Sequence, residues 1–177
     1  MDPKVAGSED IKDMIARNHT SRPPKATRPV VVSISSYRSD VLYPRVGRAV
    51  ETLLARGKVV APVDVLIGMG LLDPAQLEDW RFGRVPYLEK VIDCNLTRLS
   101  RLLRILRFHA HDLKLVPSST AYLRRGKGPK QRLRFTKTGD ERIEAAYSRR
   151  FVWPGKGPFH PPAPKVQAPT GEARARS

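Results

Sequence analysis

Apolar residues recur with the period of an α-helix through much of the central part of the chain. Over residues 40–56 they fall three or four positions apart, on one face of a helix that ends at Gly57. Two shorter helices are predicted next. One covers residues 62–69, and the other begins after the capping residue Asp73 and ends at Gly83. Two short helices joined by a turn that contains glycine are typical of a helix-turn-helix.

The longest predicted helix covers residues 87–113. At 100° per residue its apolar side chains form one broad stripe, which indicates a helix packed against a core. Arginines spaced three residues apart wrap around its polar face. A final helix is predicted after the capping-box pattern of residues 138–141, with Phe151 among its inward-facing residues.

Two segments favour β-structure. The β-branched residues 30–34 predict a short strand. Residues 119–137 predict a β-hairpin with a glycine-rich tip at 126–130, because Leu133 and Phe135 alternate with arginines. The expected fold class is therefore mainly α with a small antiparallel β-hairpin or sheet, either winged-helix-like or a helical bundle plus a wing.

Composition divides the 177 residues into three zones. Residues 1–29 are polar and are predicted to form a flexible N-terminal segment. Residues 30–152 hold the predicted helices and strands and are expected to form a single domain. Residues 153–177 are rich in proline and glycine and have little apolar surface to bury, so we expect a disordered tail.

Composition also limits the class of protein. The single cysteine excludes an internal disulfide framework, and the longest uncharged apolar run, Val65–Leu72, is too short to span a bilayer. The first residues include several acids and lack the apolar core of a signal peptide. We therefore expect a soluble, cytoplasmic protein with no membrane partner, associated with the nucleoid if it binds DNA.

Positive charge is concentrated in one part of the chain. The formal net charge is +16, from 33 Lys and Arg against 17 Asp and Glu. Residues 98–137 contain twelve basic residues and one acid, Asp112, whereas residues 37–97 and 138–151 each sum to zero. Solubility does not require such segregation, so the excess indicates attraction to a polyanion.

The basic segment predicts nucleic-acid binding, with double-stranded DNA as the favoured ligand. The hairpin carries cations and no acid, and its glycine-rich tip exposes backbone N–H groups that suit phosphate contact. Gln76 and Glu78 in the second short helix, with two nearby arginines, would supply any sequence preference at a groove. The candidate nucleic-acid-binding residues are the basic side chains of these elements: Arg81, Arg84, Arg98, Arg101, Arg104, Arg107, Arg124, Arg125, Lys127, Lys130, Arg132, Arg134 and Lys137.

Two resemblances accompany this interpretation. Residues Trp80–Pro86 (WRFGRVP) resemble the end of the second helix and the following turn in winged helices of the excisionase and MerR type. The likeness covers about residues 61–86 and ends there, since those families continue directly into a hairpin. The longer string Trp80–Glu89, with Leu133–Asp140 downstream, is similar to an uncharacterised group of small basic bacterial proteins, a resemblance that implies no activity.

We expect neither an enzyme nor a cofactor or metal site. His109 and His111 point about 200° apart on a helix, which does not suit a shared metal ion. Cys94 lies near the apolar stripe with no histidine close in sequence. Tyr122 and Tyr147 are near arginines, but nothing in the pattern fixes a base or a metal beside them.

Two other functions stay open. A structured-RNA-binding or ribosome-associated protein would use the same basic tails and Arg-rich hairpin. A protein-interaction module, such as an antitoxin-like or phage-defence component, would pair the long helix with an acidic partner or with a second copy as a homodimer.

Overall fold

The computed structural model describes residues 32–157 and residue 159. The predicted flexible segment 1–29 lies outside the described residues, as do the start of the predicted strand 30–34 and most of the predicted tail 153–177. Within the described part, no helix is both long enough and apolar enough to cross a membrane.

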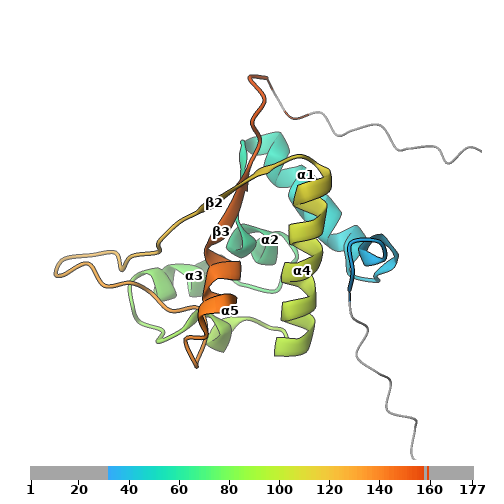
Figure 1. Cartoon of the computed structure of the whole chain (residues 1–177). Helices are drawn as coiled ribbons and strands as arrows, with labels where there is room; N and C mark the ends of the chain where they lie inside the picture. Colours follow the sequence, from blue (N-terminus) through green and yellow to red (C-terminus); the bar gives the residue numbers. More distant parts are fainter. Residues whose placement is uncertain (1–31, 158, 160–177) are drawn as a thin grey trace, which may run out of the picture. The chain divides into compact units, whose positions relative to one another are not determined.

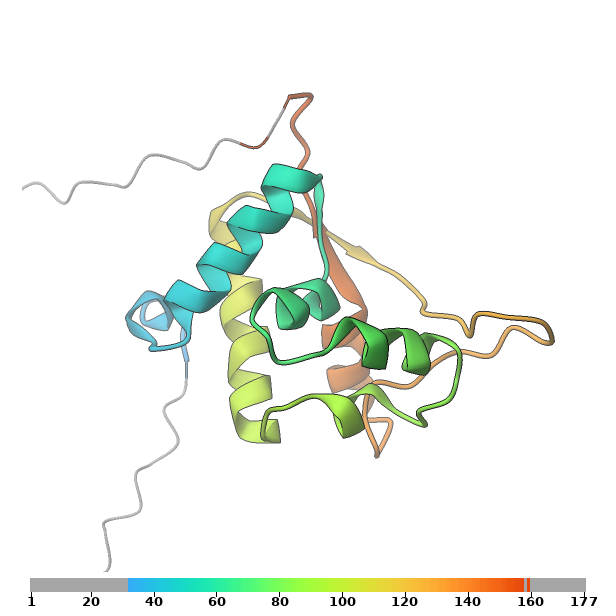
Figure 2. The same ribbon diagram turned by 180° about the vertical axis from the view of Figure 1, so that it is seen from behind.

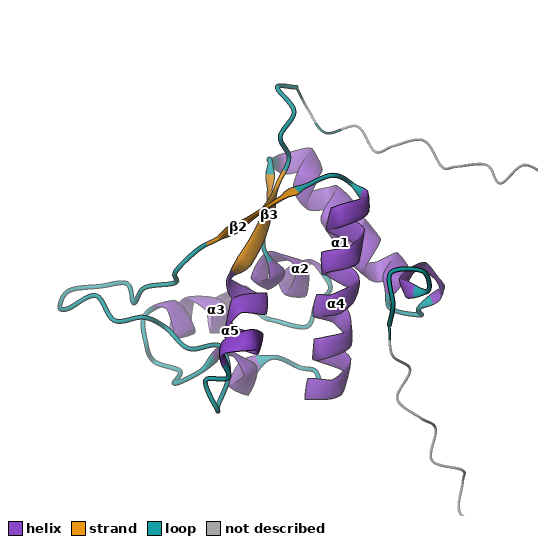
Figure 3. Ribbon diagram, in the orientation of Figure 1, coloured by secondary structure: helices purple, strands orange, loops and turns teal. Residues whose placement is uncertain are grey.

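The described residues form a mainly α-helical fold with a small antiparallel sheet, as the sequence predicts (Figure 1, Figure 3). The elements in chain order are η1 (Tyr37–Ser39), α1 (Tyr43–Arg56), β1 (Val59–Val60), α2 (Pro62–Gly68), α3 (Pro74–Arg81), η2 (Leu88–Val91), α4 (Leu96–Asp112), β2 (Val116–Ser119), α5 (Glu141–Ser148) and β3 (Arg149–Val152).

The predicted pair of short helices is present as α2 and α3. The chain leaves α2 through Gly70, whose φ of 67° lies in the left-handed region, and the Leu71 N–H donates to the Leu66 carbonyl at 2.9 Å. Asp73 then caps α3, since its carboxylate accepts the Ala75 N–H at 2.7 Å. The caps read from the sequence therefore set these helix ends.

The sheet has the strand order β1-β3-β2, and both pairings are antiparallel. The predicted strand at 30–34 is wrong over residues 32–34, which lead into η1. There Ser33 accepts the Tyr37 N–H through its carbonyl at 2.9 Å, and its own N–H donates to the Ser36 hydroxyl at 3.2 Å. This local serine turn satisfies backbone groups that a strand would have paired.

The predicted long helix at 87–113 is also wrong, because it is two elements, η2 and α4. Asn95 begins α4 by accepting the Arg98 N–H at 2.8 Å, and the Asp93 N–H donates to the Leu71 carbonyl at 2.8 Å. Leu88 is nevertheless fully buried. The apolar stripe therefore continues through the break, and periodicity alone does not reveal it.

The predicted β-hairpin is an irregular arm, residues 120–134, that extends from the rest of the domain (Figure 1). Its two halves meet at one isolated bridge, Leu123 with Arg132. Two further backbone hydrogen bonds flank the bridge, from Arg124 to Gln131 and from Leu133 to Tyr122. Longer strands do not form because residues 123–132 are all exposed and bury no apolar face.

The last helix also differs from the prediction. Asp140 caps α5 by accepting the N–H groups of Arg142 and Ile143. Because α5 ends at Ser148, Phe151 is buried from strand β3 and not from a helix. The Trp153 N–H donates to the Lys58 carbonyl at 2.7 Å, next to the end of β3.

An aromatic cluster joins α3, the base of the arm and α5. The Trp80 ring lies 5.0 Å from Phe135, which stacks on Tyr147 at 5.0 Å between ring centres. The Trp80 indole N–H donates to the Arg134 carbonyl at 2.8 Å. The buried tryptophan therefore fixes where the arm returns to the domain.

The winged-helix alternative is not established by this arrangement. The 17-residue helix α4 stands between α3 and β2, and the segment between β2 and β3 contains the arm and α5 instead of a simple wing. The accurate description is a helical domain with a three-stranded sheet and one protruding arm.

Candidate nucleic-acid interface

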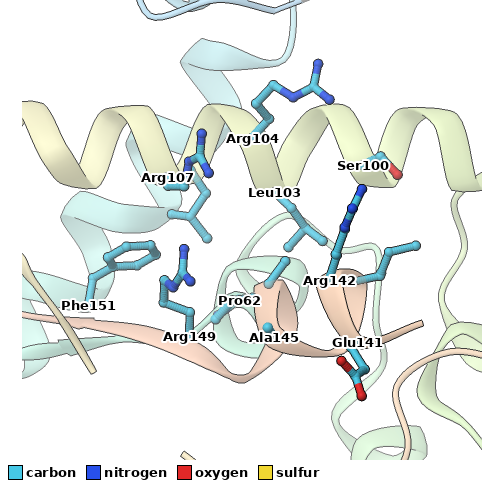
Figure 4. A pocket seen from close by; sticks show the side chains of 13 residues that line it. Pro62, Ser100, Leu103, Arg104, Arg107, Glu141, Arg142, Ala145, Arg149 and Phe151 are labelled. Carbon is cyan, nitrogen blue, oxygen red and sulfur yellow. The ribbon is translucent and has the colours of Figure 1, made fainter. Parts of the chain in front are cut away.

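A groove of about 750 Å³ lies between α4 and α5. Its floor is apolar and includes Leu103 and Phe151. Four arginines surround it, two from α4, one from α5 and one from the start of β3 (Figure 4): Arg104, Arg107, Arg142 and Arg149. We call these side chains the groove arginines.

Local helix geometry places the groove arginines at the edges of buried faces. Arg104 and Arg107 each follow a buried leucine by one position, which turns them about 100° from the core-facing direction. Arg142 stands in the first turn of α5, which the Asp140 cap fixes. Arg149 is paired with Ser119 in the β2–β3 register.

No described carboxylate neutralises the groove arginines. None of the four forms an ion pair within the described part of the chain, where every carboxylate in an ion pair is matched to another cation. Glu141 is the one acid among the described residues that line the groove. The Arg107 guanidinium lies 5.2 Å from the centre of the Phe108 ring, a contact that orients the group without neutralising it.

A second hollow of about 520 Å³ shares Arg107, Arg149 and Phe151 with the groove. It extends toward His111 at the end of α4 and toward Pro117 in β2. The pair of arginines thus stands between two adjoining depressions, where one extended anionic ligand can contact both. Guanidinium groups suit this role because their planar donors match phosphate oxygens in pairs.

The arm is held against the end of α3 by the two residues that precede its glycine-rich tip. The Arg125 N–H donates to the Arg81 carbonyl at 2.7 Å, and the Arg125 guanidinium donates to Glu78 at 2.9 Å. The Arg124 guanidinium donates to the Phe82 carbonyl at 3.2 Å. Three other cations of the arm are exposed and form no ion pair with a described residue: Lys127, Lys130 and Arg132.

The two predicted cations near α3 are neutralised locally. Arg81 donates to Glu78 at 2.9 Å, and Arg84 donates to Asp79 at 2.6 Å. Arg84 also lies over the Phe82 ring at 5.3 Å. A phosphate would have to compete with these carboxylates, so this surface is less cationic than its sequence suggests.

The remaining predicted cations are divided among different environments. Arg101 is paired with the buried carboxylate of Asp40 and therefore belongs to the scaffold. Arg98 is half-buried beside a separate hollow near the start of α4. Arg134 donates to the Lys137 carbonyl at 2.7 Å, and both side chains are exposed.

Sequence analysis misses Arg142 and Arg149, because residues 138–151 sum to zero charge. Two of the three acids of that segment are already engaged in the structure. Asp140 caps α5, and Glu144 accepts backbone N–H groups from Phe135 at 3.0 Å and Thr136 at 2.7 Å. The capping pattern at residues 138–141 is the sequence signal that points to these arginines. It indicates that Asp140 caps a helix and is therefore not free to neutralise a nearby cation.

The side chains considered for catalysis or metal binding lie in different environments. His109 is buried and His111 is exposed, and no group of three His, Cys, Asp or Glu among the described residues is placed to hold a metal ion. Burial raises the pKa of Cys94 and of Tyr122. Burial also raises the pKa of Tyr147, and its Glu89 contact adds to that effect.

No known family model matches the chain, and neither the curated proteins nor the solved structures gave a significant match.

Proposed function

We propose that this protein binds nucleic acid, with double-stranded DNA as the preferred ligand. The observation that carries the proposal is the set of four groove arginines, which gather around one groove and have no carboxylate partner in the described part of the chain. An uncompensated cluster of this kind attracts a polyanion and releases its counterions on contact.

In the proposed complex the groove and the arm have different tasks. The groove arginines contact phosphates of one strand, and the flanking hollow lets the backbone continue past Arg107. The arm extends the contact through its free cations, of which Lys127 and Lys130 lie in the tip, just beyond the Arg125 side chain that Glu78 holds. These contacts position the duplex and carry little sequence information.

The salt dependence of binding tests the proposal. Four groove arginines and three free cations on the arm would neutralise on the order of seven phosphates, giving a slope of about −6 for log affinity against log salt. We expect this slope in fluorescence anisotropy with a short labelled duplex. A flat dependence, or no binding at low salt, would contradict the proposal.

A triple variant tests the site. R104Q/R142Q/R149Q should weaken duplex binding about tenfold or more at low salt and make the slope shallower by about 3. The matched control K58Q/K90Q/K156Q removes the same charge from exposed lysines outside the groove and the arm. If both variants behave alike, net charge and not the groove determines binding.

Structured RNA is the alternative ligand, since phosphate contact alone does not separate it from DNA. Competition between unlabelled duplex RNA and duplex DNA of one sequence decides between them. We expect the DNA to displace the labelled probe at the lower concentration. The reverse order would assign the groove to RNA.

A further inference from the structure

Helix α1 carries a row of arginines in addition to the groove arginines. The zero net charge of residues 37–97 gives no sign of this row. Arg45, Arg48 and Arg56 stand at i, i+3 and i+11, within about 80° of one another on the helix, and all three are exposed. Thr52 lies in the same row. The row extends about 16 Å along the helix axis.

The row borders a groove of about 500 Å³ between α1 and α2. The two helices approach closely there. A Cβ added at Gly68 would lie only 3.3 Å from the Cβ of Ala49. The Arg45 guanidinium donates to the Met69 carbonyl at 2.6 Å, and Arg48 donates to the Pro44 carbonyl at 3.3 Å. Backbone carbonyls thus position two arginines without cancelling their charge.

Few acids oppose the row. Asp64 lines the groove and its carboxyl is half-buried. Burial raises the pKa of this carboxyl above its usual value, and the charge of Arg81 offsets only part of that increase. Glu51 is on α1, about 120° around the helix from Arg45 and about 60° from Arg48, and it forms no ion pair with either of them. None of the three row arginines forms an ion pair with a described residue.

The row and the groove arginines are on different sides of the domain. In Figure 1, α4 and α5 lie in front and α1 and α2 lie behind them; the 180° view in Figure 2 brings α1 and α2 to the front. The core-facing residues of α1, such as Val46 and Val50, are fully buried between these sides. One rigid duplex segment therefore does not reach both arginine sets.

We propose that the α1 row is a second phosphate-binding surface, so that one molecule bridges two nucleic-acid duplexes. This inference rests on the proposed function. The row is long enough to follow about five phosphates of one strand, since a duplex strand carries one phosphate per about 3.4 Å of axis. Several arginines in line match a polyanion with regularly spaced phosphates, and we assign that role to the backbone of a second duplex.

A capture experiment tests bridging. One duplex is immobilised on beads, a second labelled duplex is free, and the retained label is measured with and without protein. We expect the wild type to retain the label. The variant R48Q/R56Q should lose about nine-tenths of the retained label, while its affinity for a single duplex in solution falls by no more than about threefold.

The variant leaves the Arg45–Met69 contact in place, and thermal unfolding confirms that it is folded. K58Q/K90Q is the charge-matched control and should bridge like the wild type. R48K/R56K keeps the charge and should restore bridging. A stable dimer with one site per copy would bridge regardless of α1, so retained bridging by R48Q/R56Q overturns the inference.

The outcomes separate the two proposals. A wild type that binds one duplex but retains no label contradicts the second surface and leaves the proposed function in place. A wild type that binds no duplex contradicts the proposed function itself.

Discussion

His109 stands on the buried face of α4, with its ring 5.3 Å from Tyr43 and 6.5 Å from Tyr37. Neither of its nitrogens has a hydrogen-bond partner among the described residues. Burial lowers the pKa of His109, the charge of Arg38 lowers it further, and Asp112 acts in the opposite direction. The imidazole is therefore neutral in the folded protein near neutral pH.

Acid should destabilise the protein through this residue. Because the folded-state pKa is below the unfolded value of about 6.5, the stability is fully present above pH about 6.5 and is lost as the pH falls toward the folded pKa. We expect H109F to remove this component. Urea unfolding of both proteins between about pH 7 and pH 5 would show the wild type losing stability relative to the variant.

Comparison with the variant isolates the histidine from other titrating groups. Burial raises the pKa of Glu89, so that carboxyl has the opposite effect and favours the folded state as the pH falls. It is present in both proteins and cancels in the difference. Parallel pH profiles for wild type and H109F would contradict a neutral buried imidazole.

Helices with clear caps and apolar faces are the elements that the sequence predicts well. Short-range signals such as Asp73 before α3 act within a few residues and need no tertiary partner. Local patterns do not predict the break before α4, because there the Asp93 N–H donates to the carbonyl of Leu71, a partner distant in sequence. The alternation of apolar residues and arginines predicts a regular hairpin, but regular strands need a face that is at least half-buried, and residues 123–132 are all exposed.

Removing the cap of α4 tests this account of the break. In N95A the Arg98 N–H loses its side-chain acceptor, so we expect the free energy of unfolding to fall by about 1 kcal/mol. N95D is the matched control, because aspartate caps comparably, and should stay near the wild type. Urea unfolding measures both, and an N95A protein as stable as N95D would show that the cap is not what fixes this helix start.

Ion pairs between distant segments redistribute charge over the whole molecule. Asp40 pairs with Arg101 and Glu78 pairs with Arg125, so acids of the neutral segment 37–97 neutralise cations of the basic segment 98–137. The α1 row is left without a carboxylate partner within the described residues. Unpaired cations therefore lie on the groove, on the arm and on the α1 row, and not in one stretch of sequence.

Neutralising Glu78 tests this redistribution. Glu78 holds both Arg81 and Arg125, so E78Q should free two guanidinium groups beside the arm. We expect duplex affinity to rise about three- to tenfold and the salt slope to steepen by about 1 or 2. D93N removes one exposed negative charge elsewhere and serves as the control. Equal gains in the two variants would mean that only net charge had changed.

The sequence by itself determined the helical fold class, the caps of the short helices and the size of the positive excess, because each depends on neighbouring residues or on composition alone. The tertiary structure decided which cations are free. Asp40 and Arg101 are 61 residues apart, and Glu78 and Arg125 are 47 apart, so no local pattern reveals their pairing. An ion pair depends on distances of a few ångströms, which the fold sets.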